Sequence, residues 1–327
     1  MKSFILFMLT IIMLAGVLFL PAAAQTLEAN TADRQSDITL PSLGEHKFIP
    51  SNMLRMPFIS TNIRSTLGFG QTADLVIPIP DIGGREIPGI EGDLFYAVLE
   101  FHYMQKVKSW LGFWVRLNTL GRLSTETSTL ISEGINTSIS FELGWMFKLW
   151  KNESMMLSGS VGLWNNAYTD INLINFIQKI IDNGGLTPDN KLIDNVPVVR
   201  GLGGLHYAWA ISDMTGINVM MEIGYGEAFV RSKEDDWSSN LGIAIDLDLN
   251  PRLEVPIGFS LAYWQSAGLL NSLKNTTIPR SFSIILAYTG EQKFSLQLQS
   301  GYAWYKPDGY ENNIKFINSN LTMRYYF

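Results

Sequence analysis

The chain has 327 residues, a formal net charge of −6 at pH 7 and no cysteine, and 46% of its residues are hydrophobic while 17% are charged. The acidic balance gives no reason to expect a nucleic-acid partner, and without disulfides an exported chain must be held together by backbone pairing and packing. Beyond the N-terminus no run of about eighteen apolar residues occurs, which excludes ordinary transmembrane helices.

Residues 1–24 have the pattern of a secretory signal peptide. Lys2 supplies the positive start, residues 4–20 form an uncharged apolar stretch, and residues 21–24 supply the small side chains that precede a cleavage site. We expect cleavage after residue 24; the alternative is an uncleaved anchor helix, although no basic residues follow that would stop transfer. Residues 25–56 are polar and lack a clear period, and we expect a periplasmic segment that either enters the following domain as a plug or stays a free tail.

From about residue 57 onward, apolar residues alternate with small or polar residues, which is the period of a strand with one apolar face. The clearest stretch, 135–149, places Phe141 and Trp145 on one parity and Glu142 on the other. We predict about twelve strands with uncertain boundaries, near 57–69, 93–105, 108–119, 134–149, 153–166, 197–211, 217–230, 239–249, 256–266, 279–289, 293–305 and 314–327.

The predicted connections alternate between tight turns and longer loops. An even number of strands with short turns at one end and long loops at the other is typical of membrane-spanning barrels. The predicted fold class is therefore all-β, a transmembrane antiparallel up-and-down β-barrel over residues 57–327. A soluble β-sandwich is the alternative, but it predicts shorter strands and no systematic difference between loops.

The longest loop, 167–196, contains a helical pattern that begins at Asp170. Ile174, Ile177 and Ile181 lie on one line of a helix, with Asp170 as the N-cap and two glycines after the last turn as the stop. We expect a short helix in this external loop, which either packs on the barrel, lies on the membrane interface or binds a partner.

The last predicted strand ends the chain with an aromatic residue. Phe327, Tyr325, Met323 and Leu321 share one parity, with polar residues between them. In this respect, and in its signal peptide and loop pattern, the chain resembles the outer-membrane β-barrels of Gram-negative bacteria. The resemblance implies a multi-pass barrel in the outer membrane, in contact with lipid and lipopolysaccharide, and it implies that the barrel-insertion machinery reads Tyr325 and Phe327 as a membrane-insertion signal. It names no function.

The sequence offers little for catalysis or metal binding. It has three histidines, no Gly-x-Ser-x-Gly elbow, no His-x-x-x-His pair and no Asp-rich calcium loop. We therefore predict that the chain is not an enzyme and binds no metal or cofactor. A barrel lipid hydrolase is the least favoured alternative, because the two histidines of the barrel have inward parity.

Most of the charged residues of the predicted strands also stand at positions whose parity points inward. Twelve strands lie between the roughly eight whose interior side chains fill and the sixteen to eighteen that enclose an open channel. We therefore predict a narrow channel or passive transporter for a small solute, whose charged interior selects what passes. The alternative is a structural barrel without transport, in which the charges pair with one another and the loops bind a protein partner. The candidate lumen-lining residues are Arg64, Glu100, His102, Arg116, Glu142, Arg200, His206, Glu222, Asp246, Asp248 and Arg324.

Overall fold

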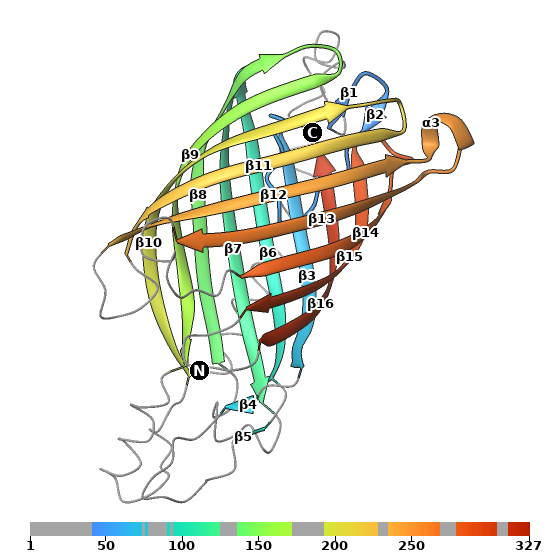
Figure 1. Cartoon of the computed structure of the whole chain (residues 1–327). Helices are drawn as coiled ribbons and strands as arrows, with labels where there is room; N and C mark the ends of the chain where they lie inside the picture. The colour runs from blue at the N-terminus through green and yellow to red at the C-terminus, as the bar shows by residue number, and fades with distance from the viewer. Residues whose placement is uncertain are drawn as a thin grey trace, which may run out of the picture. The chain divides into compact units, whose positions relative to one another are not determined.

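The core of the structure is a closed β-barrel (Figure 1). The computed structural model describes residues 41–73, 76–77, 90–91, 94–124, 136–171, 193–227, 235–268, 279–305 and 313–327. Each of twelve strands pairs antiparallel with the next, and the last pairs with the first to close the barrel. The strands are β3 (Asn62–Ala73), β6 (Leu94–Lys108), β7 (Leu111–Ser124), β8 (Asn136–Lys151), β9 (Met155–Ile171), β10 (Ile193–Ala210), β11 (Thr215–Gly226), β12 (Asp236–Asp248), β13 (Ile257–Gly268), β14 (Arg280–Tyr288), β15 (Phe294–Tyr305) and β16 (Ile314–Tyr326). The predicted fold class is confirmed.

The first barrel strand begins at Asn62, not near residue 57 as predicted. Pro57 has no backbone N–H to donate to a ladder, and its carbonyl accepts a hydrogen bond from the Ser158 hydroxyl at 2.6 Å. The predicted signal peptide and residues 25–40 of the predicted periplasmic segment lie outside the described residues, so their boundaries stay predictions.

Two small two-stranded sheets and one short helix accompany the barrel strands. The strands β1 (Ser42–Leu43) and β2 (His46–Lys47) form a hairpin, and β4 (Val76–Ile77) pairs with β5 (Ile90–Glu91) between β3 and β6. The short helix α3 (Asn250–Leu253) lies in the turn between β12 and β13, and its C-cap residue, Glu254, has a left-handed φ of 55°. Within the described ranges, no helix is long and apolar enough to cross a membrane.

The helix predicted from Asp170 falls mainly outside the described residues, and its proposed cap is wrong. Asp170 and Ile171 belong to β9, where they pair with Asp194 and Ile193 of β10. The β9–β10 ladder continues past the point where the helical pattern begins, because each added pair satisfies further backbone donors and acceptors. At these two residues strand pairing overrides the local pattern, and the rest of the predicted helix stays a prediction.

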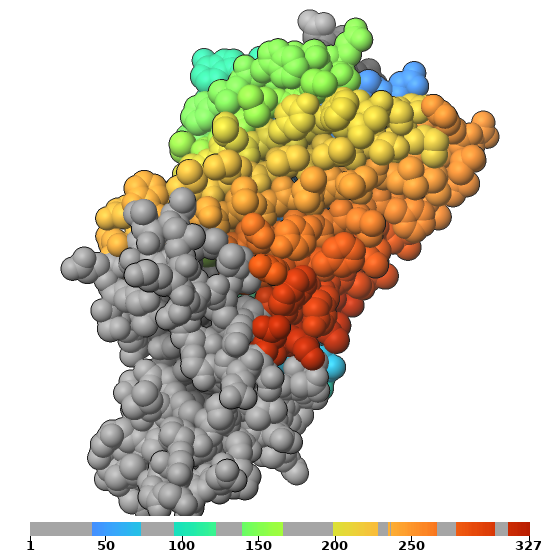
Figure 2. Space-filling view, in the orientation of Figure 1, coloured from blue at the N-terminus to red at the C-terminus, as the bar shows by residue number. Residues whose placement is uncertain are grey.

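The alternation of side chains follows the predicted parity, and β14 shows it without interruption. Phe282, Ile284 and Leu286 are 38%, 54% and 42% exposed on the outer face, while Ser283 and Ile285 are fully buried inside. Figure 2 shows β10 to β16 as oblique neighbouring bands that form one outer face. A closed sheet leaves no unpaired edge, which is what a hydrocarbon environment requires of a strand protein.

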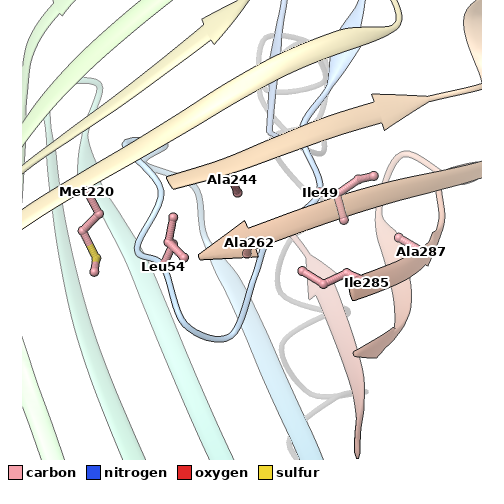
Figure 3. Close-up of a cluster of buried hydrophobic side chains, with 7 residues drawn as sticks. All are labelled: Ile49, Leu54, Met220, Ala244, Ala262, Ile285 and Ala287. Atoms are coloured by element: carbon pink, nitrogen blue, oxygen red, sulfur yellow. The ribbon is translucent and has the colours of Figure 1, made fainter. Parts of the chain in front are cut away.

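Residues 41–61, here called the lumenal segment, lie inside the barrel. The segment includes the β1–β2 hairpin, which lies at the same end as α3 and the short turns (Figure 1). Its Ile49 and Leu54 pack against an apolar part of the inner wall formed by β11 to β14 (Figure 3). The wall residues of this cluster are Met220, Ala244, Ala262, Ile285 and Ala287. The main apolar packing inside the barrel therefore lies between the wall and this segment.

Candidate functional site

A continuous row of mostly charged residues crosses the inner wall. Its members stand opposite one another in register on consecutive strands from β16 through β3 to β10, and we call it the charged row. Because barrel strands are tilted and staggered, such a row climbs the wall rather than forming a flat ring. The charged row is Arg324, Arg64, His102, Arg116, Glu142, Trp164 and Arg200.

Glu100 of β6 binds two arginines of the charged row. Arg64 Nη2 is paired with Glu100 Oε1, and Arg116 donates to Glu100 Oε2 from Nε at 2.8 Å and from Nη2 at 2.5 Å. Glu100 is buried, and a buried carboxylate needs such donors to offset the water it has lost. Arg116 also reaches Glu142, with 3.7 Å between Nη1 and Oε2.

The lumenal segment inserts its own cation beside this network. Arg55 Nη2 is paired with Glu142 Oε1 on β8, and Arg55 Nε lies 3.7 Å from Glu222 Oε1 on β11. The Arg55 guanidinium carbon lies 4.1 Å from the centre of the Trp114 ring, which is within the range of a cation–π interaction. Arg55 thus bridges two strands that are not neighbours in the sheet.

Arg55 was not among the residues predicted from the sequence. The prediction relied on the period of strands, and residue 55 precedes the barrel in a stretch without one. One signal is visible in retrospect: Arg55 is a single cation flanked by Leu54 and Met56, the composition of a buried segment that carries one charge.

Asp246 and Asp248 accept hydrogen bonds at the short-turn end of the lumen. Asp246 Oδ2 accepts from the Ile49 backbone N–H at 3.2 Å and from Asn218 Nδ2 at 2.8 Å. Asp248 Oδ1 accepts from the Thr289 hydroxyl at 2.9 Å. Asp246 therefore binds the lumenal segment directly, whereas Asp248 ties β12 to the turn after β14.

Small residues of the wall make room for side chains of the lumenal segment. A Cβ built on Gly242 would lie 2.9 Å from Leu54 Cγ, and one on Gly258 would lie 2.5 Å from Ile49 Cδ1. The space that the inward glycines leave in the wall is thus filled by the chain's own N-terminal residues.

No family model and no curated protein matches the sequence. The structure is similar to that of an outer-membrane channel from Pseudomonas putida F1, with a TM-score of 0.52 and 13% identity over 86% of this chain and 100% of the other. The chain has the fold of a bacterial outer-membrane β-barrel. At this identity the likeness concerns the fold.

Two further solved structures are more distant. A deletion mutant of the monoaromatic hydrocarbon channel TodX has a TM-score of 0.46 and 10% identity, over 89% of this chain and 98% of that one. The KdgM porin has a TM-score of 0.41 and 8% identity, over 80% of this chain and 99% of that one.

The barrel histidines face the lumen and do not assemble a triad. His206 Nε2 lies 2.8 Å from the Ser160 hydroxyl, so a serine and a histidine do meet. Within the described residues, however, Nδ1 of His206 has no hydrogen-bonded carboxylate to orient the ring, as a hydrolytic triad requires. His102 belongs to the charged row between Arg64 and Arg116.

The other predicted site residues lie as follows. Arg200 Nη1 donates to the carbonyl of Glu227 at 2.7 Å, near the long-loop end of the barrel. Arg324 Nη1 lies 3.4 Å from the Tyr326 hydroxyl at the opposite end. In the part of the chain that the structure describes, no group of three or more His, Cys, Asp or Glu side chains is placed to hold a metal ion.

The two aromatic residues of the predicted insertion signal stack at the end of the last strand. The Tyr325 and Phe327 rings are 6.1 Å apart, and Phe327 also stacks with Tyr103 of β6 at 6.5 Å. The backbone N–H of Phe327 donates to the Thr61 carbonyl at 3.1 Å, beside the start of β3. The C-terminus thus lies at the seam that closes the outer-membrane barrel.

Proposed function

We propose that the protein is a channel for the passive passage of a small solute across the outer membrane, and that the lumenal segment closes it. The observation that carries this proposal is how the segment is held. One backbone–backbone hydrogen bond, from Phe327 to Thr61, joins its last residue to the end of β16. Its other contacts with the wall involve side chains, such as those of Arg55, Ile49 and Leu54, and none of the described strand pairings joins it to the barrel ladder.

A plug held by side chains can leave without breaking the backbone hydrogen bonds that hold the strands. The charged row behind it has the composition of a constriction that sorts solutes by charge and hydrogen bonding. Both features are expected of a channel that opens on demand, and neither is needed by a barrel that serves only as an anchor.

The test is conductance in planar lipid bilayers. We expect the full chain to open rarely and the double variant Ile49→Ala, Leu54→Ala to open more often, because truncation removes the apolar packing of the segment while the ladder stays intact. Deletion of the 167–196 loop, in the same assay, reports whether that loop narrows the outer mouth. A complete absence of conductance in all three forms would contradict the channel.

That negative result would favour the second candidate, a structural barrel that binds a partner through its external loops. The specific observation in its favour is that the lumenal segment and the wall bury one another at the short-turn end, with Leu43, Phe48, Ile49 and Leu54 all at 5% exposure or less. In that case the buried charges only pair with one another inside the barrel, and no solute passes.

We further infer that residues 1–24 direct export, that the barrel-insertion machinery recognises Tyr325 and Phe327, and that the outer face contacts lipid and lipopolysaccharide. The support is the apolar outer face and the aromatic C-terminal end. Fractionation of cells that express the full chain tests the location: recovery in the inner membrane or in the soluble periplasm would contradict it.

A further inference from the structure

The guanidinium of Arg55 occupies a site that belongs to the barrel wall. Three wall residues from three strands meet it: Glu142 of β8, Glu222 of β11 and Trp114 of β7. Two carboxylates and the face of an indole are the groups that recognise a delocalised cation in proteins. The occupant comes from the chain itself, which shows that the site accepts a guanidinium.

The aromatic part of this site is built into the sheet. Gly144 and Gly162 are direct cross-strand neighbours. A Cβ on Gly144 would lie 2.5 Å from the Trp114 ring, and a Cβ on Gly162 would lie 3.2 Å from it. A Cβ at Gly144 would clash with the indole and one at Gly162 would crowd it, so the two glycines let the ring lie against the wall. Trp114 is buried, and its Nε1–H donates to Glu142 Oε1 at 3.2 Å, so the same side chain offers a ring face and orients a carboxylate.

The two carboxylates depend on Arg55 to different degrees. Glu142 has a second cation, Arg116, at 3.7 Å. Among the described residues, Arg55 is the one cation within ion-pair distance of Glu222. A buried carboxylate without a partner is costly, so withdrawal of Arg55 leaves a site that favours another cation.

The chain leaves room for that withdrawal. Arg55 precedes the first strand residue, Asn62, by seven residues, and a chain of that length spans up to roughly 25 Å when extended. The guanidinium can therefore leave the wall while β3 stays in the barrel.

We propose that Glu142, Glu222 and Trp114 form a binding site for small organic cations of the guanidinium class, and that Arg55 is its internal ligand while the lumenal segment is in place. This inference rests on the proposed channel function and names the class of solute that the channel takes. A solute of this class competes with Arg55, and because it binds the wall only where Arg55 is absent, it shifts the segment toward the displaced state.

The direct test is binding of methylguanidinium to the purified full chain carrying Arg55→Ala. In this variant Ile49 and Leu54 still hold the segment, and the missing side chain leaves a space that matches the probe. Isothermal titration calorimetry should detect saturable binding, and methylurea, a neutral molecule of similar shape, should show none.

The matched variant is Arg55→Ala with Glu222→Gln. It should bind methylguanidinium roughly ten- to a hundredfold more weakly, since the buried carboxylate that stands 3.7 Å from the cation is replaced by a neutral amide. It should also fold at least as well as the single variant, because it removes a buried charge that has lost its cation; heat-modifiable mobility in gels checks this. Should it not fold, Glu142→Gln in the same background provides the same comparison.

Three results would overturn the site: no saturable binding to the Arg55→Ala protein, equal binding after Glu222→Gln, or equal binding of methylurea. Bilayer recordings separate this inference from the channel proposal. Binding without conductance in any variant retains the cation site and removes transport, whereas conductance without binding retains the channel and removes the cation site.

Discussion

Replacement of Gly242 by alanine should loosen the lumenal segment while leaving the barrel intact. The three atoms nearest to a Cβ at this position all belong to Leu54, at 2.9, 3.2 and 3.3 Å. Excess volume at a packed contact typically costs about 1–3 kcal/mol. If all of that cost destabilises the seated state of the segment, the ratio of seated to displaced segment falls by roughly 5- to 150-fold, at about 1.4 kcal/mol for each factor of ten.

The assay uses the absence of native cysteine. A single reporter, Ser51→Cys, lies in the segment at a position that is 2% exposed, and its rate of reaction with a maleimide in liposomes reports the displaced fraction. We expect faster labelling in the Gly242→Ala background by about the factor given above.

Gly201→Ala is the matched control, because it also adds a methyl group to a barrel glycine, but at a position where the nearest atom is 3.8 Å away. Equal labelling rates in the Gly242→Ala and Gly201→Ala backgrounds would refute the inference that this wall glycine seats the segment.

Three further predictions concern the charged network, pH and assembly. Glu100→Gln leaves Arg64 and Arg116 without their shared carboxylate and should lower the free energy of unfolding by about 3 kcal/mol, measured by urea titration in detergent; an unchanged midpoint would contradict the pairing. Burial lowers the pKa of His46 below its usual value of 6.5, so the displaced segment binds a proton more readily than the seated one. Seating should therefore weaken as the pH falls through about 6.5. The measure is the rate of Ser51→Cys labelling divided by the rate for the same reporter in the His46→Phe background at the same pH, which cancels the loss of thiolate; this ratio should rise as the pH falls, and a constant ratio would contradict the role of His46. Deletion of Phe327 removes its stacking on Tyr103 and should reduce the amount of folded barrel assembled in cells, whereas protein refolded in detergent should still show heat-modifiable mobility; equal assembly in cells would count against the insertion signal.

The sequence alone determined the twelve barrel strands, with approximate bounds, and the side of the wall on which most of their residues lie. Successive side chains of a strand point to opposite faces, so a period of two predicts the inward placement of Arg64, Glu142 and Asp246 without knowledge of any partner. The same local signal, with alternating loop lengths and the terminal Phe327, was sufficient for the barrel and its strand count.

A local signal fails where strand pairing competes with it. The helical pattern places an N-cap at Asp170, yet Asp170 and Ile171 pair across β9 and β10. The extension of a ladder depends on the neighbouring strand, which the pattern within one segment does not contain.

Only the tertiary structure decided which inward residues meet. Register depends on each turn, on the irregular pairing at Lys106/Lys108 and Lys148/Trp150, and on closure of the last strand onto the first, and these properties belong to pairs of strands. The contact between Arg55 and Glu142 joins residues 87 positions apart across the lumen. No period along the chain encodes such a contact, because it exists only once the barrel is closed around the segment.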